Sequence, residues 1–381
     1  YCEINLLELI AIFLIVDEVE IDPSIKENEL TVSLYDEAGK QMLTFTPVVK
    51  DPTSPLPEIV DRPLLPHQIE NTEECFLVGL RNLQFHNPFV DPVDYFQEVL
   101  RRDPGDTRAN TQMGVYYRIR AEYDKAADYL RKAIKRQTKD YTRPKDAEAM
   151  YNLGLILKTQ GKREAAYDTL YRATWNYTYN SGANTQLAQM YAEEGRYEEA
   201  LERLEEAIAY NGRNYSALNF KGTILKKMGK TDAAKECFER VLADQPVNSY
   251  ALYETSSPAE FRKFMREQPE SYLELAILYW HNGFKDTAIK LLEDIDSRVP
   301  YPTVKLYLGY FTDNEKYYHG AFSYRDLVIT KQNLLSLPDT ALRSVLRQST
   351  YLQRQRPYVL NLHRHTTILE TYFTTSSQTM P

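Results

Sequence analysis

Few residues in this sequence could do chemistry, and most of them are scattered. The His-Arg-His run at 363–365 could hold a metal, but no cysteine or carboxylate cluster lies near it in the sequence, so a basic tail is the better interpretation. The carboxylate pairs Glu193-Glu194 and Glu198-Glu199 bracket a short turn and could form an acid/base site. Glutamates at helix ends usually serve solubility and the helix dipole, and we favour that interpretation.

No recognised catalytic motif is present. The sequence lacks GxSxG, a phosphate-binding loop, HExxH and CxxC. Cys2, Cys75 and Cys237 are unclustered and odd in number, which predicts reduced thiols and a cytoplasmic location. We therefore predict no metal, no cofactor, no catalytic residue and no enzyme activity for this chain, and leave the activity of any longer protein open.

Composition limits the partners. The formal net charge of −8 over 381 residues argues against nucleic acid, which is usually bound by a basic surface. The longest apolar run, from Leu9 to Val16, is too short for a transmembrane helix, which needs about 20 residues. The 30 tyrosines against 14 glycines fit packed helices better than a loop-rich enzyme. We expect neither nucleic acid nor a membrane as partner.

The N-terminal region has the pattern of strands. In residues 1–50, a buried strand is expected at 9–16, and an alternating segment around Asp36-Glu37-Ala38-Gly39 predicts a hairpin. Residues 51–68 are rich in proline and predict an extended connector. Because strands without further partners make a poor domain, we interpret residues 1–50 as a remnant of a β-sandwich-type domain.

Residues 69–310 are predicted to be helical, and they contain an internal repeat. Five small reference residues, Gly114, Gly154, Ala188, Gly222 and Ala276, are each followed by alanine 12 residues later, at Ala126, Ala166, Ala200, Ala234 and Ala288. A large residue follows at 16, and a glycine at seven in the last four repeats. The steps between reference residues are 40, 34, 34 and 54 residues, with insertions at 137–146 and a short added helix at 258–267.

This pattern resembles the tetratricopeptide repeat, which has a period of about 34 residues. Small residues let two antiparallel helices cross closely, and the large residue fills the adjacent space. The resemblance implies a mainly α fold, an α-solenoid forming a right-handed superhelix of about six helical pairs. A degenerate repeat is expected to begin at 76–80, and a further helix at 305–310.

Residues 311–381 are predicted to be a separate basic extension, partly disordered. The last 51 residues carry six lysines and arginines against two acidic residues, and the final eight are polar and without pattern. Such a tail could contact nucleic acid or the acidic body of the chain. A poorly structured extension, or sequence outside the natural reading frame, is an equal alternative.

A larger resemblance covers roughly residues 25–310. Segments such as RRDPGD at 101–106 and ATWN at 173–176 are similar to an uncharacterised bacterial family. Its members carry an N-terminal β-domain of unknown function, similar to galactose-mutarotase-like supersandwiches, followed by tetratricopeptide repeats. The resemblance implies that residues 1–66 are the tail of that domain and pack on the repeats. Its link to carbohydrate is an analogy from fold alone.

The expected binding surface is the concave groove lined by the first helix of each pair. Positions three before, two before and one after the reference residue should face it. These positions give Thr111, Gln112, Val115, Tyr151, Asn152, Leu155, Thr185, Gln186, Gln189, Asn219, Phe220 and Thr223. An aromatic rim is expected at Trp175, Tyr177, Tyr179 and Asn180, although these side chains could instead pack between repeats.

The groove does not match the carboxylate clamp by which some tetratricopeptide proteins bind acidic chaperone termini. The clamp has Lys, Asn, Asn, Lys and Arg where this chain has Thr111, Val115, Asn152, Gly182 and Gln186. Only Asn152 fits, and neutral side chains cannot neutralise a carboxylate. We predict a protein-interaction scaffold that binds a protein or peptide, including its own β-domain. The alternative is an accessory module of a carbohydrate-binding or carbohydrate-processing protein whose sugar site lies upstream.

Overall fold

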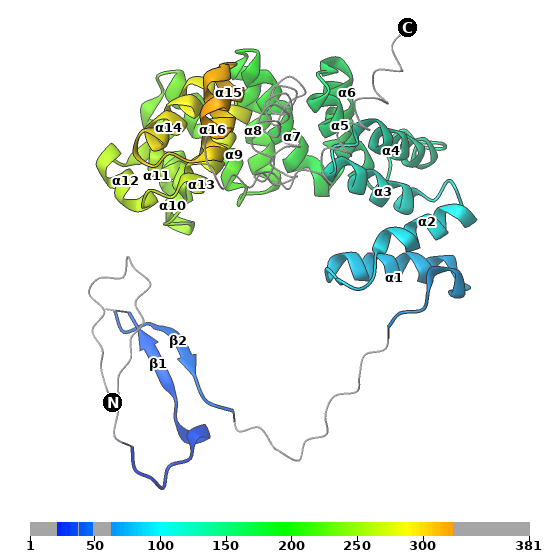
Figure 1. The fold of residues 1–381 in the computed structure, drawn as a ribbon, viewed down its shortest axis with the longest axis horizontal. Helices are drawn as coiled ribbons and strands as arrows, with labels where there is room; N and C mark the ends of the chain where they lie inside the picture. Colours follow the sequence, from blue (N-terminus) through cyan, green and yellow to red (C-terminus); the bar gives the residue numbers. More distant parts are fainter. Residues whose placement is uncertain (1–20, 37, 49–61, 323–381) are drawn as a thin grey trace. The chain divides into compact units, whose positions relative to one another are not determined.

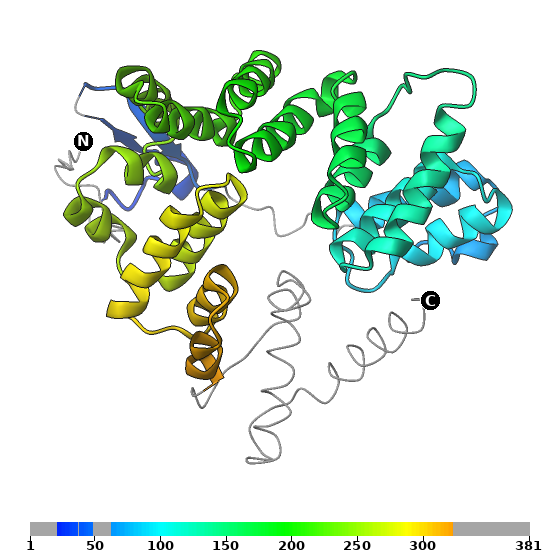
Figure 2. The same cartoon turned by 90° about the horizontal axis from the view of Figure 1, so that it is seen from above.

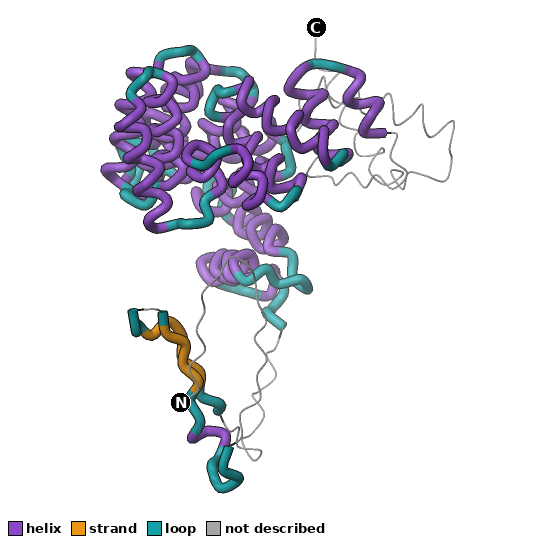
Figure 3. Tube along the Cα trace, turned by 90° about the vertical axis from the view of Figure 1, so that its left-hand side faces the viewer, coloured by secondary structure: helices purple, strands orange, loops and turns teal. Residues whose placement is uncertain are grey.

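The computed structural model describes residues 21–36, 38–48 and 62–322 (Figure 1). It divides into two compact units, one ending at Pro63 and one beginning at Leu64, and each is described by itself. The first unit contains a β-hairpin, and the second contains sixteen α-helices within the described ranges. Figure 3 shows this separation of strand from helix along the chain. The strand expected at 9–16 and the extension from 323 onward lie outside the described residues.

The predicted hairpin is confirmed. Strands β1 (Val32–Tyr35) and β2 (Gln41–Phe45) pair antiparallel, with Leu34 opposite Leu43. The Asp36 carboxylate accepts hydrogen bonds from the backbone N–H groups of Ala38 (3.0 Å) and Lys40 (2.8 Å), which closes the turn. The apolar side chains of β2 are exposed within the described structure.

The second unit is a succession of helices joined by short turns. Their bounds are α1 (Thr72–Gln84), α2 (Pro92–Arg102), α3 (Thr107–Ile119), α4 (Tyr123–Gln137), α5 (Glu148–Thr159), α6 (Arg163–Ala173), α7 (Tyr177–Glu193), α8 (Tyr197–Tyr210), α9 (Tyr215–Lys227), α10 (Thr231–Asp244), α11 (Ser249–Thr255), α12 (Pro258–Met265), α13 (Pro269–His281), α14 (Lys285–Arg298), α15 (Pro302–Thr312) and α16 (Glu315–Phe322). Helices that follow one another in sequence pack together, as Figure 2 shows.

Each helix pair is held by a close crossing at its small reference residue. A Cβ atom added at Gly154 would lie 2.6 Å from Leu170 Cγ, and one at Gly114 would lie 2.5 Å from Leu130 Cγ. At Gly222 the same position is 2.7 Å from the Phe238 ring. These distances leave no room for a methyl group, which explains why the small residue and the large residue of the second helix recur together.

The same crossing extends the repeat beyond its clearest copies. A Cβ at Gly79 of α1 would lie 2.8 Å from Tyr95 Cβ of α2, and Tyr95 occupies the position of the recurring large residue. In the last pair, a Cβ at Gly309 would lie 2.7 Å from the ring of Tyr318. Tyr318 comes nine residues after the glycine and not sixteen, so a close approach is kept there with a different partner position. The degenerate repeat predicted at 76–80 and the further helix predicted at 305–310 each belong to a helix pair, and helices continue to Phe322.

In every pair that has a reference residue, except the last, the turn uses a left-handed residue seven positions after that residue. Gly161, which follows Gly154 at the turn between α5 and α6, has φ of 71°. In the preceding pair the equivalent residue is Ala121, which has φ of 58°. The Cβ atom of alanine makes this left-handed conformation unfavourable, whereas glycine adopts it readily.

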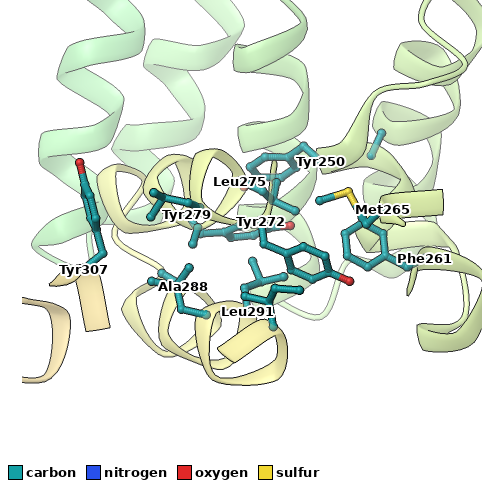
Figure 4. Packing of buried hydrophobic residues seen from close by; sticks show 14 of the residues in the cluster. Tyr250, Phe261, Met265, Tyr272, Leu275, Tyr279, Ala288, Leu291 and Tyr307 are labelled. Carbon is teal, nitrogen blue, oxygen red and sulfur yellow. The ribbon is translucent and has the colours of Figure 1, made fainter. Parts of the chain in front are cut away.

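The longest step between reference residues, from Gly222 to Ala276, contains two more helices than the other steps, α11 and α12. Helix α11 begins in phase with the preceding repeats, because Asn248 caps Ala251 N–H (3.1 Å) as Asn214 caps Ala217 N–H (3.0 Å). Helix α12, predicted at 258–267, begins with a capping box between Ser257 and Glu260. Its Phe261 ring lies 5.8 Å from that of Tyr272 and joins the largest buried cluster (Figure 4). The insertion is therefore part of the core.

We expect Gly154→Ala to lower the free energy of unfolding by about 1–3 kcal/mol, because its methyl group would overlap Leu170. Gly182→Ala is the matched control: its Cβ would meet Tyr151 at 3.4 Å or more, an ordinary contact, so stability should hold or rise. Urea denaturation followed by circular dichroism measures both. Equal stability of the two variants would contradict the crossing described here.

Ala121→Gly should raise the free energy of unfolding by up to about 1 kcal/mol, because glycine removes the strain of the left-handed turn. Gly161→Ala should lower it by a similar amount, since no atom outside its own backbone lies within 4 Å of the new Cβ and only the backbone penalty remains. Thermal melting of the two variants should shift in opposite directions, and shifts of the same sign would exclude this explanation.

Candidate binding surface on the inner row of helices

The first helices of successive pairs form a row, here called the inner row: α3, α5, α7, α9 and α11. Within it α3 contacts α5, α5 contacts α7, and α9 contacts α11. The surface that this row presents, called the inner face, carries most of the groove residues predicted from sequence. Positions on it are counted from the reference residue of each pair.

A ladder of hydrogen bonds runs along the inner row. A cation one helical turn after the reference residue donates to a side chain that lies just before the next reference position. Arg118 Nε donates to Asn152 Oδ1 (2.8 Å), and Lys158 Nζ donates to Gln186 Oε1 (3.0 Å). Further along, Lys226 Nζ donates to Glu254 Oε2 (2.8 Å). These bonds link each helix of the row to the next.

Between α7 and α9 the ladder is interrupted by apolar residues. Ala192 takes the position of the cation and Phe220 that of its hydrogen-bond partner, and both side chains are buried. Phe284, from the turn between α13 and α14, packs on this cluster with its ring 6.1 Å from that of Phe220. A Cβ at Gly283 would lie 3.3 Å from Glu193 N, so this turn sits directly against the end of α7.

A polar network accompanies this contact. Gln189 Nε2 donates to Asn282 Oδ1 (3.0 Å) across 93 residues of sequence. Asn282 Nδ2 donates in turn to the Tyr250 hydroxyl (3.4 Å), which also lies 3.0 Å from Thr223 Oγ1. Burial raises the pKa of Tyr250 above its ordinary value, so this hydroxyl stays protonated. The network ties the inner row to α13.

Glu254 is the acidic residue beside this polar network. It accepts hydrogen bonds from the Tyr279 hydroxyl (2.5 Å) and from Lys226 Nζ (2.8 Å). The Tyr279 ring stacks on that of Tyr250 with centroids 4.3 Å apart. Tyr250 and Tyr279 both belong to the cluster shown in Figure 4. The inner face around α9 and α11 is therefore filled by side chains of the chain itself.

The predicted groove residues separate into two groups. The half-exposed ones are Gln112, Val115, Tyr151, Leu155, Thr185, Gln186 and Gln189. The buried ones are Thr111, Asn152, Asn219, Phe220 and Thr223.

The prediction that all of these residues face a partner needs correction at the buried positions. Phe220 has 0% exposure because Phe284 covers it. The Thr111 hydroxyl donates to the Thr107 carbonyl (2.7 Å), and Asn219 Nδ2 donates to Asn248 Oδ1 (3.0 Å). These side chains stabilise the helices and offer no surface to a partner.

The predicted aromatic rim is likewise divided. Trp175 is 39% exposed and Tyr177 is 75% exposed. Tyr179 is half-buried, and its ring lies 5.4 Å from that of Tyr151. Asn180 is buried and donates to the Thr174 carbonyl (2.8 Å). Only Trp175 and Tyr177 present aromatic surface here.

Sequence reasoning missed the charged residues of the inner face. Gln112 Nε2 approaches the Glu148 carboxylate at 3.4 Å, and burial followed by the charge of Asp146 raises the pKa of Glu148. Lys158 Nζ donates to Gln189 Oε1 (2.7 Å) as well as Gln186, and burial lowers its pKa to about 8. In the described part of the chain neither charge forms an ion pair. The signal that could have found Lys158 is the recurrence of cations one helical turn after the reference residue.

Three of the four carboxylates considered for acid/base chemistry form ion pairs, and Glu198 has none within the described residues. Arg163 contacts Glu193 (2.9 Å) and Glu194 (2.8 Å), and Arg196 contacts Glu199 (2.9 Å). Burial opposes the effect, but hydrogen bonds from Arg163 and its neighbours lower the pKa of Glu194. The hydrogen bond with Arg196 lowers the pKa of Glu199. The pKa of neither carboxyl is thus raised toward that of a general acid.

Residues 21–36, 38–48 and 62–322 contain no group of three or more His, Cys, Asp or Glu side chains able to hold a metal. No helix in the same ranges combines the length and the apolar character needed to cross a bilayer. Cys75 and Cys237 are free and buried, and the 363–365 histidines lie outside the described residues.

Consecutive antiparallel helix pairs with one recurring crossing define an α-solenoid repeat protein. Its repeats are tetratricopeptide repeats: family models of the tetratricopeptide repeat match residues 111–178 and 191–253. Such repeats are generally scaffolds for protein interaction. The mutarotase-like domain suggested by the sequence resemblance stays a prediction.

Individual proteins share this likeness over part of their length. The BBSome complex member BBS4 of Bos taurus is 25% identical over 171 residues, which are 45% of this chain and 31% of that protein. A crystal structure of MamA is 24% identical, covers 49% of this chain and 97% of its own, and has a TM-score of 0.38. A tetratricopeptide repeat protein from Parabacteroides merdae has 14% identity and a TM-score of 0.44, covering 73% and 98%.

The pKa of Lys158 predicts a pH dependence of stability. It is about 8 in the folded chain and returns to its ordinary value of 10.5 on unfolding. Between these values the unfolded chain binds more protons, so the contribution of Lys158 to the free energy of unfolding rises with pH. The difference between wild type and Lys158→Met should increase by about 1–2 kcal/mol from pH 7.5 to pH 10. Urea denaturation at both pH values measures it, and a constant difference would contradict this pKa.

Proposed function

We propose that this protein is a scaffold whose inner face, over α3, α5 and α7, binds a segment of a protein partner. The observation that carries the proposal is a stripe along α5. Glu148, Tyr151, Leu155 and Lys158 recur at helical spacing on one face and are half-exposed. The stripe joins an acid, an aromatic ring, an apolar side chain and a base, which is the mixture found in peptide-binding surfaces.

The charged groups at the two ends of this stripe, Glu148 and Lys158, can exchange their present hydrogen-bond partners for groups of a bound segment. Glu148 is contacted by the Gln112 amide, and Lys158 by the amides of Gln186 and Gln189. A charged group held by neutral amides gains when an opposite charge replaces one of them, because charge-assisted bonds are about twice as strong as neutral ones. We therefore expect charged groups of a partner to replace these amides as hydrogen-bond partners of the stripe.

The extent of the surface follows from what the chain covers. Around α9 and α11 the inner face is filled by Phe284 and by the Tyr250–Glu254 network. The proposed surface therefore ends at α7. Its other edge is set by the aromatic pair Tyr151 and Tyr179 and by the exposed rings of Trp175 and Tyr177.

The partner class is a protein, and the family resemblance puts a β-domain of the same polypeptide among the candidates. A carbohydrate is the second candidate, and the observation that favours it is the exposure of Trp175 and Tyr177 beside Asn176. Exposed aromatic rings next to amides suit stacking on sugar faces. A glycan array probed with the chain, and with a longer protein that restores upstream sequence, tests this candidate; no bound glycan in either would remove it.

The peptide proposal is tested with a synthetic library of short peptides, selected on the 381-residue chain. Fluorescence polarisation then gives affinities for the selected peptides. Leu155→Glu should weaken binding about tenfold or more, because it adds a second negative charge to the middle of the stripe.

Val247→Glu is the control, since this exposed side chain lies in the connection between α10 and α11, away from the stripe. It should leave affinity unchanged. Failure to select any peptide, or equal loss in both variants, would overturn the proposal.

A further inference from the structure

The amine of Lys158 has an unused donor. An ammonium group carries three N–H donors. Two of these reach amide oxygens, Gln186 Oε1 at 3.0 Å and Gln189 Oε1 at 2.7 Å. Across the part of the chain that the structure describes, the third has no acceptor and no carboxylate pairs with this charge. The amine lies on the inner face, on the last turn of α5.

Three helices meet at this amine. Gln189 of α7 accepts from Lys158 with its oxygen and donates to Asn282 with its nitrogen (3.0 Å). Asn282 directly follows His281, the last residue of α13. His281 is exposed. The residues at this place are therefore brought together by the contact between α7 and the α13–α14 turn.

The other titratable groups near the Lys158 amine are Glu193, Arg163 and His281. Glu193 of α7 is paired with Arg163 of α6 (2.9 Å). The surrounding protein, and then the charge of Lys158, lower the pKa of His281, so its imidazole is mainly neutral near pH 7 and can still donate one N–H. Glu193 raises the pKa of Lys158 and Arg163 lowers it, and burial outweighs both. Lys158 is thus the one unpaired cation among these groups.

We propose that Lys158 binds a carboxylate of the protein segment that occupies the inner face. This inference rests on the proposed function and names the chemistry of its ligand. A carboxylate fits better than a dianionic phosphate, because one unpaired ammonium balances one negative charge.

The chain contains its own precedent for this interaction. Lys226 occupies the same repeat position as Lys158, one helical turn after the reference residue. Its amine binds the Glu254 carboxylate at 2.8 Å, and the residue that meets Lys158 at the position equivalent to Glu254 is the uncharged Gln186. The Glu254 side chain is 6% exposed and the Lys226 side chain 53% exposed, so this repeat position holds a largely buried carboxylate against a partly exposed lysine. At Lys158 a partner would supply the acid that α11 supplies at Lys226.

Selected library peptides provide the probe. Each is synthesised in its original form and with every Asp, Glu and terminal carboxylate replaced by its amide. Lys158→Gln should weaken binding of the acidic form about tenfold and leave the amidated form unchanged. Lys162→Gln is the matched control, since the exposed Lys162 amine also donates to a glutamine, Gln160 (2.9 Å). It should change neither affinity.

The pH profile provides a second readout. Wild-type affinity should fall as pH rises above about 8, where the amine loses its proton. Lys158→Arg should keep the affinity and remove this fall, because arginine stays charged.

The outcomes separate the two proposals. If peptides bind and Leu155→Glu weakens them, but Lys158→Gln and amidation have no effect, the carboxylate site is wrong and the scaffold function stands. If no peptide binds, the scaffold proposal itself fails. Circular dichroism of each variant confirms that it is folded. Because Lys158→Arg keeps the positive charge, it separates an effect of the charge from an effect on the structure.

Discussion

The close crossing of two helices at a small residue is the constraint on which the second unit depends. Each pair has a glycine or alanine on its first helix and, in most copies, a large side chain facing it from the second, and the two cannot be enlarged independently. The crossing sets the angle and spacing within a pair, and so decides which positions of the first helix remain available to the next pair. The ladder from Arg118 to Glu254 uses those positions.

This dependence explains what the sequence could predict. The reference residues, the left-handed turns, the hairpin and the added helix at 258–267 are all encoded by short or fixed spacings, and all are found. The burial of Phe220 is encoded differently, since it depends on Phe284, which belongs to a later pair beyond an irregular insertion. No local pattern carries that information. The charge at Lys158 was visible, but its isolation from other charges appears only once the surrounding helices are placed.

The inner row contains two kinds of surface made from one repeated position. Around α3 and α5 its cations are held by the amides of Asn152 and Gln186. Around α9 the cation meets Glu254 and is neutralised inside the chain. At the rung between them, Ala192 and Phe220 replace polar groups with apolar ones, and Phe284 covers them. A few substitutions at equivalent positions thus divide a uniform scaffold into an open part and a closed part.

The bond between Gln189 and Asn282 also bears on how the chain unfolds. Solenoids are usually quasi-one-dimensional: each repeat stabilises only its neighbours, so arrays fray from their ends and separate into partly folded segments. This contact joins two residues that are 93 positions apart in the sequence, so α7 and the helix pairs that follow it form a closed ring of contacts. Opening any pair inside that loop strains or breaks the contact that closes it. The stretch from α7 to α14 should therefore melt as a single cooperative block, with α1 to α4 free to fray before it.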